Sequence, residues 1–250
     1  MADRPYETRT VTANLELRDE DSAPVLTGYA STFNDPYQVG FFRERIHPDA
    51  FKRTLSGAPD VRLLVDHEGQ PLARTKSGTL ELRTDAKGLS VRATLDPSDP
   101  DVQRLLPKMR RGDLDQMSFA FRVPAGGEEW DYSGDMPDRT IREANLSGGD
   151  VSVVTYPANE NATAQLRARD ERESAYVLAE AMLREVRSGV EFDAANIDRL
   201  KAALDALGVN LTTRTATTET APTETETRTT LTKEAAEAIR LAGELRRSAA

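Results

Sequence analysis

Gln116-Met-Ser-Phe-Ala-Phe-Arg122 decides the fold, because apolar and polar residues alternate along it with the period of a β-strand. Successive side chains of a strand point to opposite faces. Every second residue from Met117 to Val123 is therefore predicted to be buried. Ser118 lies on the opposite row beside the small Ala120. We expect its hydroxyl to be exposed in a cleft that admits an extended peptide.

The same alternation recurs on both sides of this segment and predicts a mainly β (α+β) fold of about seven or eight strands. Two short helices are predicted between strands, over Pro48–Leu55 and Ser98–Met109. Gly88 closes a predicted hairpin, where it supplies a positive φ. Short strands with few helices favour a barrel or sandwich over a parallel sheet. The remaining predicted strands comprise 11–17, 25–33, 61–67, 80–82, 89–95, 139–144 and 150–156.

Composition excludes several classes of function. The 250-residue chain carries a formal charge of −9, which is unlike the basic surface of a nucleic-acid-binding protein. It has no cysteine, so disulfides, thiolate metal sites and a cysteine nucleophile are excluded. No apolar run approaches the ~18 residues of a membrane span, and the start lacks a signal sequence. We therefore expect a soluble intracellular protein.

Neither a cofactor nor a metal ion is expected. The carboxylates of Asp66, Glu68, Asp85 and Asp96 are scattered rather than set at ligand spacing. No glycine-rich phosphate-binding loop is present, since Gly126-Gly127 runs into two glutamates.

The character of the chain changes near residue 168. Residues 169–210 have the apolar spacing of two helices, the second capped by Asp193 and ended by Gly208. Residues 211–230 are rich in Thr and Glu and are predicted to form a disordered linker. Residues 231–250 form a predicted amphipathic helix, which is either a docking element or a frayed tail. The predicted domain itself covers residues 1–168.

Nucleophilic chemistry has few sources in a chain with two histidines and no cysteine. A serine hydroxyl needs a base to take its proton, and imidazole is suited to that role. His67 closes the predicted strand Val61–His67, and a regular strand would place it on the face of Leu63 and Val65. Asp66 would then point away from the ring.

A third group usually orients the imidazole, and Asp150 is our candidate because it opens a strand after two glycines. Ser152 is an alternative nucleophile that its neighbours do not favour. His47 is interpreted as a residue of a helix start.

The ordered segments resemble the prohead maturation proteases of tailed bacteriophages, the serine peptidases of the HK97 type. The resemblance covers about residues 9–168. It rests on stretches in chain order, which are Gly28–Asn34, Ile46–Phe51, Leu63–Glu68 with Pro71–Arg74, the Gly88-Leu89 hairpin, Gly112–Phe121 and Asp150–Asn159.

That resemblance implies an assemblin-like β-barrel flanked by short helices, often dimeric. It implies that Ser118 is the nucleophile, His67 the general base and Asp150 the third member of a triad. The oxyanion stabiliser is left open between Arg139, Arg142 and a backbone N–H. The implied activity is that of an endopeptidase inside the procapsid, in the host cytoplasm. It would cleave capsid-protein or scaffold segments and the protease itself, without binding nucleic acid or membrane. A non-enzymatic capsid-assembly or scaffolding protein is the alternative.

Overall fold

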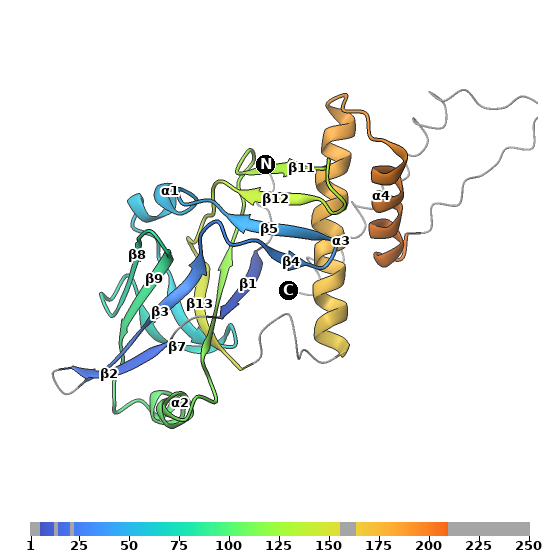
Figure 1. Ribbon diagram of the computed structural model, residues 1–250. Helices are drawn as coiled ribbons and strands as arrows, with labels where there is room; N and C mark the ends of the chain where they lie inside the picture. The colour runs from blue at the N-terminus through green and yellow to red at the C-terminus, as the bar shows by residue number, and fades with distance from the viewer. Residues whose placement is uncertain (1–5, 13–14, 21–22, 156–163, 210–250) are drawn as a thin grey trace, which may run out of the picture. The chain divides into compact units, whose positions relative to one another are not determined.

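The computed structural model describes residues 6–12, 15–20, 23–155 and 164–209 (Figure 1). This part of the chain contains thirteen strands and four helices. The helices are α1 (Lys52–Ser56), α2 (Pro100–Arg110), α3 (Ala164–Arg187) and α4 (Ala194–Ala206). The strands are β1 (Glu7–Thr12), β2 (Glu16–Glu20), β3 (Ala23–Thr32), β4 (Tyr37–Val39), β5 (Phe42–Ile46), β6 (Arg62–Val65), β7 (Glu68–Arg74), β8 (Leu80–Thr84), β9 (Gly88–Thr94), β10 (Gln116–Phe121), β11 (Glu128–Asp131), β12 (Asp138–Ile141) and β13 (Asp150–Val154).

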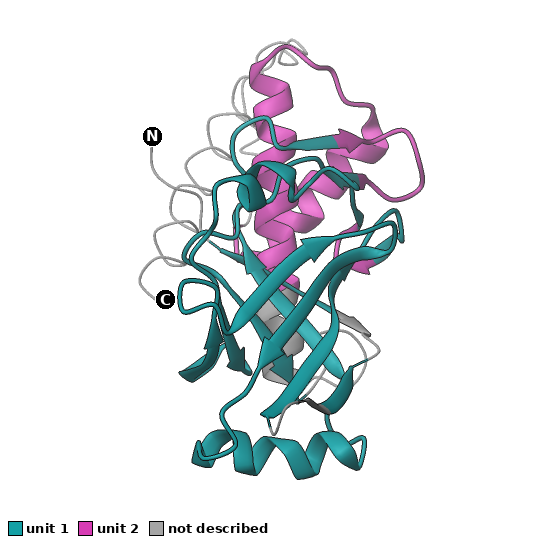
Figure 2. Ribbon diagram, turned by 90° about the vertical axis from the view of Figure 1, so that its left-hand side faces the viewer, with its two compact units in different colours: residues 1–37, 44–129, 139–164 teal, residues 38–43, 130–138, 165–250 magenta. Residues whose placement is uncertain are grey.

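The chain divides into two compact units, which Figure 2 shows in different colours. Unit 1 comprises residues 1–37, 44–129 and 139–164, and unit 2 comprises residues 38–43, 130–138 and 165–250. The predicted boundary at residue 168 stays a prediction. The predicted linker and last helix, 211–250, lie outside the described residues.

The strands form three sheets with the orders β1-β10-β13-β6-β7, β2-β3-β9-β8 and β11-β12-β5-β4. In the first two sheets, neighbouring strands run antiparallel except for the parallel pair β13–β6. The fold is therefore mainly β, as predicted, although the described residues hold more strands than expected. The closed barrel that the resemblance implies stays a prediction.

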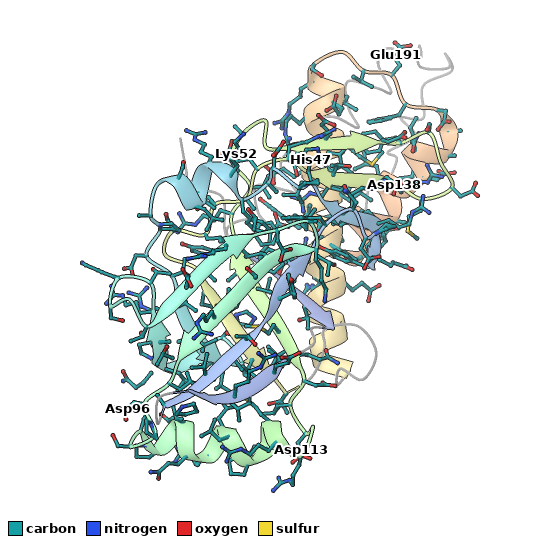
Figure 3. All side chains as sticks on the ribbon, turned by 60° about the vertical axis from the view of Figure 1, so that its left-hand side comes forward. His47, Lys52, Asp96, Asp113, Asp138 and Glu191 are labelled. Atoms are coloured by element: carbon teal, nitrogen blue, oxygen red, sulfur yellow. The ribbon has the colours of Figure 1, made fainter. Side chains whose placement is uncertain are left out.

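The core of unit 1 is built from the predicted apolar rows. Met117, Phe119 and Phe121 of β10 are buried together with side chains from β3, β6, β9, β13 and α2. The ring of Phe51, just before α1, meets Phe119 edge-on with centroids 5.8 Å apart. Helices α1 and α2 lie at opposite ends of this unit (Figure 1). Asp96 and Asp113 mark the two ends of α2 in Figure 3. Met117, Phe119 and Phe121 are thus buried as the alternating pattern predicted, but Ser118 and Ala120 on the other row are buried as well.

Gly88 corrects one expectation about the β8–β9 hairpin. The hairpin forms as predicted, but Gly88 is absent from the residues with positive φ. A Cβ atom at this position would lie 1.9 Å from the carbonyl oxygen of Ser31. Glycine is therefore required here for the close approach of β3 and β9, rather than for an unusual backbone angle.

The predicted helices of unit 2 are present. Asp193 caps α4 by accepting a hydrogen bond from the Asn196 N–H at 2.8 Å. Leu178 and Met182 of α3 are buried in one cluster with Leu200 and Leu204 of α4. None of the described helices is both long and apolar enough to span a membrane.

A buried charge network links β1 to the third sheet within unit 1. Arg139 is 1% exposed, and its guanidinium lies 2.6 Å from Glu7, 2.7 Å from Glu44 and 2.6 Å from Glu128. Arg9 contacts the same Glu7 and Glu44 at 2.7 and 2.6 Å. Burial opposes the charge on Arg9, but the attraction of the two glutamates outweighs it and raises the pKa of Arg9. The network therefore keeps the two buried guanidinium groups charged inside the fold.

Replacing Arg139 with Leu should lower the free energy of unfolding by about 3–5 kcal/mol, because buried carboxylates lose their partner. Urea denaturation followed by circular dichroism measures the effect. Arg18→Ala is the matched control, since its ion pair with Glu16 is exposed and should contribute little. Equal midpoints for the Arg139→Leu variant and the unmodified chain would contradict the stabilising role of the network.

Candidate active site

His67 lies in a tight turn and not on a strand, which corrects the predicted strand 61–67. Strand β6 ends at Val65, and Val65 pairs directly with Glu68 of β7. Asp66 and His67 between them both have positive φ, 52° and 60°. Two-residue hairpin turns of type I′ require this left-handed backbone at both central positions. The signal in the sequence was the Asp-His-Glu-Gly69 stretch, which contains typical turn residues.

The turn places the His67 ring on the face of the sheet opposite the apolar row of Leu63 and Val65. Leu63 and Val65 stand in register with Val151 and Val153 of β13, on the apolar face. A regular strand would have put His67 on that same buried row, as the sequence analysis expected. The left-handed turn instead directs the ring to the opposite face of the sheet.

Three side chains meet on that face. The Nδ1 atom of His67 lies 2.6 and 2.8 Å from the two carboxylate oxygens of Asp150. Its Nε2 atom lies 2.7 Å from the Oγ atom of Ser118. The three residues that the sequence analysis selected are therefore joined by hydrogen bonds, although 83 and 51 positions separate His67 from the other two.

The pairing of β10 with β13 explains how Ser118 and Asp150 come together. Ser118 stands opposite Ser152, and Asp150 lies two residues earlier on the same face of β13. The turn before β13 brings the two strands very close, because a Cβ atom at Gly149 would lie 2.2 Å from the carbonyl oxygen of Ala120. Glycine at position 149 thus allows Asp150 to enter the sheet beside β10.

Ser118 is only 1% exposed, so the expectation of an exposed hydroxyl was wrong. The flanking strand β1 explains part of this burial, since Thr10 pairs with Ser118. The Ser118 hydroxyl also lies 3.0 Å from the carbonyl oxygen of Arg9, the residue whose side chain enters the buried charge network. This backbone contact gave no signal in the sequence, because any residue at position 9 has a carbonyl.

The hydrogen bonds define which way protons can move. An ionised carboxylate only accepts hydrogen bonds, so the Nδ1 atom of His67 carries the proton that faces Asp150. The Nε2 atom is then left with a lone pair that can accept the Ser118 proton. The arrangement can therefore activate a hydroxyl and hold a positive charge on the imidazole.

Other candidate residues have different positions. Arg139 forms ion pairs with the buried glutamates of the charge network, and Arg142 pairs with the exposed Glu129 at 2.8 Å. The Nδ1 atom of His47 accepts the Asp49 N–H at 3.1 Å, in keeping with a residue at a helix start. Within the described residues, no three acidic or histidine side chains form a group that could hold a metal ion.

Comparison with known protein families supports a serine peptidase. Residues 11–175 match the model of the Caudovirus prohead serine proteases. The chain belongs to this family. The match covers more than half of the chain and includes the three hydrogen-bonded residues. The curated proteins and the solved structures yielded no match.

The prohead serine protease family identifies the activity. The protein is a serine peptidase of phage head maturation, and its substrates belong to the capsid and scaffold proteins of the procapsid. An enzymatic function thus replaces the alternative of a purely structural assembly protein.

Gly149→Ala should destabilise the site region, because the added Cβ would overlap the Ala120 carbonyl. We expect a loss of about 1–3 kcal/mol in the free energy of unfolding, the usual range for overpacking, and slower peptide cleavage. Urea denaturation and a cleavage assay measure the two effects. Gly57→Ala is the control, since its nearest neighbour would be 3.5 Å away. Similar stabilities for both variants would refute the close-approach argument.

Proposed function

We propose that Ser118 is the nucleophile of this peptidase, that His67 is its general base and acid, and that Asp150 orients His67. The observation that carries this proposal is the unbroken chain of hydrogen bonds from Asp150 through the imidazole to the Ser118 hydroxyl, with heavy-atom distances of 2.6 and 2.7 Å. Both lie in the range in which proton transfer to a positioned base is efficient.

The reaction then follows in two stages. The Ser118 Oγ atom attacks the scissile carbonyl carbon while its proton passes to the Nε2 atom of His67. The carbon–nitrogen bond breaks, and His67 donates that proton to the leaving amine, which leaves an ester on Ser118. Water attacks the ester, gives a proton to His67, and the proton returns to the departing Ser118 oxygen. Asp150 stabilises the imidazolium in each stage and remains a carboxylate.

The substrate assignment can be made finer. We propose cleavage of the major capsid protein or a scaffold segment inside the procapsid, which assembles in the host cytoplasm. A homodimer, which the family resemblance implies, belongs to the same proposal.

Ser118→Ala should abolish processing, with a fall in turnover of about 10³-fold or more, because no other group can form the ester. The variant is co-expressed with the capsid protein of the same phage, and intact-mass spectrometry measures the fraction cleaved. Ser31→Ala serves as the matched control, since Ser31 is equally buried but bonds only to the Thr32 carbonyl. Normal processing by the Ser118→Ala variant would eliminate Ser118 as the nucleophile.

Self-cleavage is the second part of the proposal. The Thr- and Glu-rich residues 211–230, predicted to form a linker, are the expected site, since exposed unpaired segments are preferred by peptidases. The purified unmodified chain should contain a species truncated in this segment, whereas the Ser118→Ala chain should keep its full mass. Mass spectrometry of both distinguishes self-cleavage from a host protease, which would cut both chains alike.

A further inference from the structure

The turn that contains His67 is hydrogen-bonded to strand β13 through its backbone, in addition to the bond that the His67 ring makes with Asp150. The Asp66 N–H donates to the carbonyl oxygen of Val153 at 3.0 Å. The Asp66 carboxylate accepts hydrogen bonds from the backbone N–H and the hydroxyl of Thr155, both at 2.7 Å. The backbone N–H of His67 itself donates to the Ser152 hydroxyl at 3.2 Å. Four hydrogen bonds thus hold a two-residue turn against its neighbour.

These contacts matter because the backbone of the turn is intrinsically unfavourable. L-residues other than glycine seldom adopt positive φ, and Asp66 and His67 do so in succession. Aspartate and histidine tolerate this conformation better than most residues. Each nevertheless has a Cβ atom that crowds the backbone at positive φ, which a glycine would not. Without ties to β13, the turn could relax and carry the imidazole away from its partners.

Ser152 occupies the central place in this arrangement. Its side chain is fully buried, at 0% exposure. The hydroxyl oxygen accepts a hydrogen bond from the His67 N–H. The hydroxyl proton points toward the Oδ1 atom of Asp150, which lies 3.4 Å from the hydroxyl oxygen. One hydroxyl thus contacts both the backbone of the base and the carboxylate that holds the ring of the base.

We propose that Ser152 and Asp66 are positioning residues that hold His67 in line between Asp150 and Ser118. The proposal rests on the roles assigned to those three residues under the proposed function. Both are proposed to act through the position of His67 and not on the substrate. Asp66 acts through Thr155 on the backbone of the turn, and Ser152 acts on the His67 N–H.

The test measures the reactivity of Ser118 in the full-length chain with an alkyl fluorophosphonate, which forms a covalent serine adduct and releases fluoride. Ser152→Ala and Asp66→Gly should lower the maximal rate of labelling by about 10- to 100-fold, because small misplacement of a catalytic group has effects of that size. The half-saturating probe concentration should change by less than about threefold, since probe binding is untouched. Asp66→Gly keeps a residue that accepts positive φ and removes only the side-chain tie.

Conservative variants separate positioning from general stability. Asp66→Asn keeps an oxygen that accepts the Thr155 N–H and also tolerates positive φ, so it should label within about threefold of the unmodified chain. Ser31→Ala removes a buried hydroxyl elsewhere and should label normally. Thr155→Val removes one exposed hydroxyl and should slow labelling several-fold, and Thr155→Ser should restore it. If a variant at Asp66 or Ser152 fails to fold, the two Thr155 variants still test whether the Asp66–Thr155 contact positions His67.

A proton spectrum provides a signature that does not depend on activity. The chain has only two histidines, so the His67 Nδ1–H signal in histidine-labelled protein can be assigned with a His67→Gln variant. That signal should be sharp in the unmodified chain and in Asp66→Asn, and broadened by exchange with water in Ser152→Ala and Asp66→Gly.

The outcomes separate the two proposals. Labelling of the Ser118→Ala chain at the normal rate would overturn the proposed function and the positioning roles with it. Absence of labelling in Ser118→Ala, together with normal rates and sharp signals in Ser152→Ala, Asp66→Gly and Thr155→Val, would overturn the positioning roles alone. Reduced rates with unchanged half-saturation and restoration by the conservative variants would establish them.

Discussion

The parallel pairing of β13 with β6 is the constraint on which the arrangement of the site depends. It sets Val65 beside Val153, so the turn after Val65 begins next to the end of β13. The turn then folds back along the strand, where the His67 N–H meets Ser152 and the ring reaches Asp150. Because β13 also pairs with β10, the same strand brings the imidazole within 2.7 Å of the Ser118 hydroxyl. One strand therefore aligns all three groups.

The opposite face of the same sheet borders the buried network of arginine and glutamate side chains. Arg9 and Arg139 are buried among glutamates, where the attraction between opposite charges must offset the loss of hydration. Arg9 belongs to β1, and its backbone carbonyl oxygen lies 3.0 Å from the Ser118 hydroxyl. The network and the site therefore meet at β1, whose charged side chains enter the network and whose backbone contacts Ser118. Tyr37 joins the network through Glu44 at 2.7 Å, and burial raises its pKa well above the usual value.

Much of the fold was open to prediction because its signals are local. The alternation around Ser118 predicted the buried row of β10, and Asp193 predicted the start of α4. The short strands β4, β5 and β11 escaped prediction because so few residues show no clear period, and β7 escaped it because its first four residues, Glu68 to Pro71, are all exposed and do not alternate. The choice of Asp150 as the partner of His67 rested on its place after two glycines, and the structure brings the two together. The burial of Ser118 was missed, since nothing in its own strand indicates what pairs beside it.

The amino-acid sequence by itself determined the class of chemistry, since two histidines and no cysteine leave few nucleophile–base pairs, and it determined the pattern of buried and polar rows on each strand. Only the tertiary structure decided which face His67 occupies. A strand pattern has period two and assigns His67 to the apolar row, whereas positive φ at Asp66 and His67 reverses the chain and moves the ring to the other side. That backbone is maintained by contacts with Ser152 and Thr155, residues more than 80 positions away, and distant contacts of this kind leave no local period to detect.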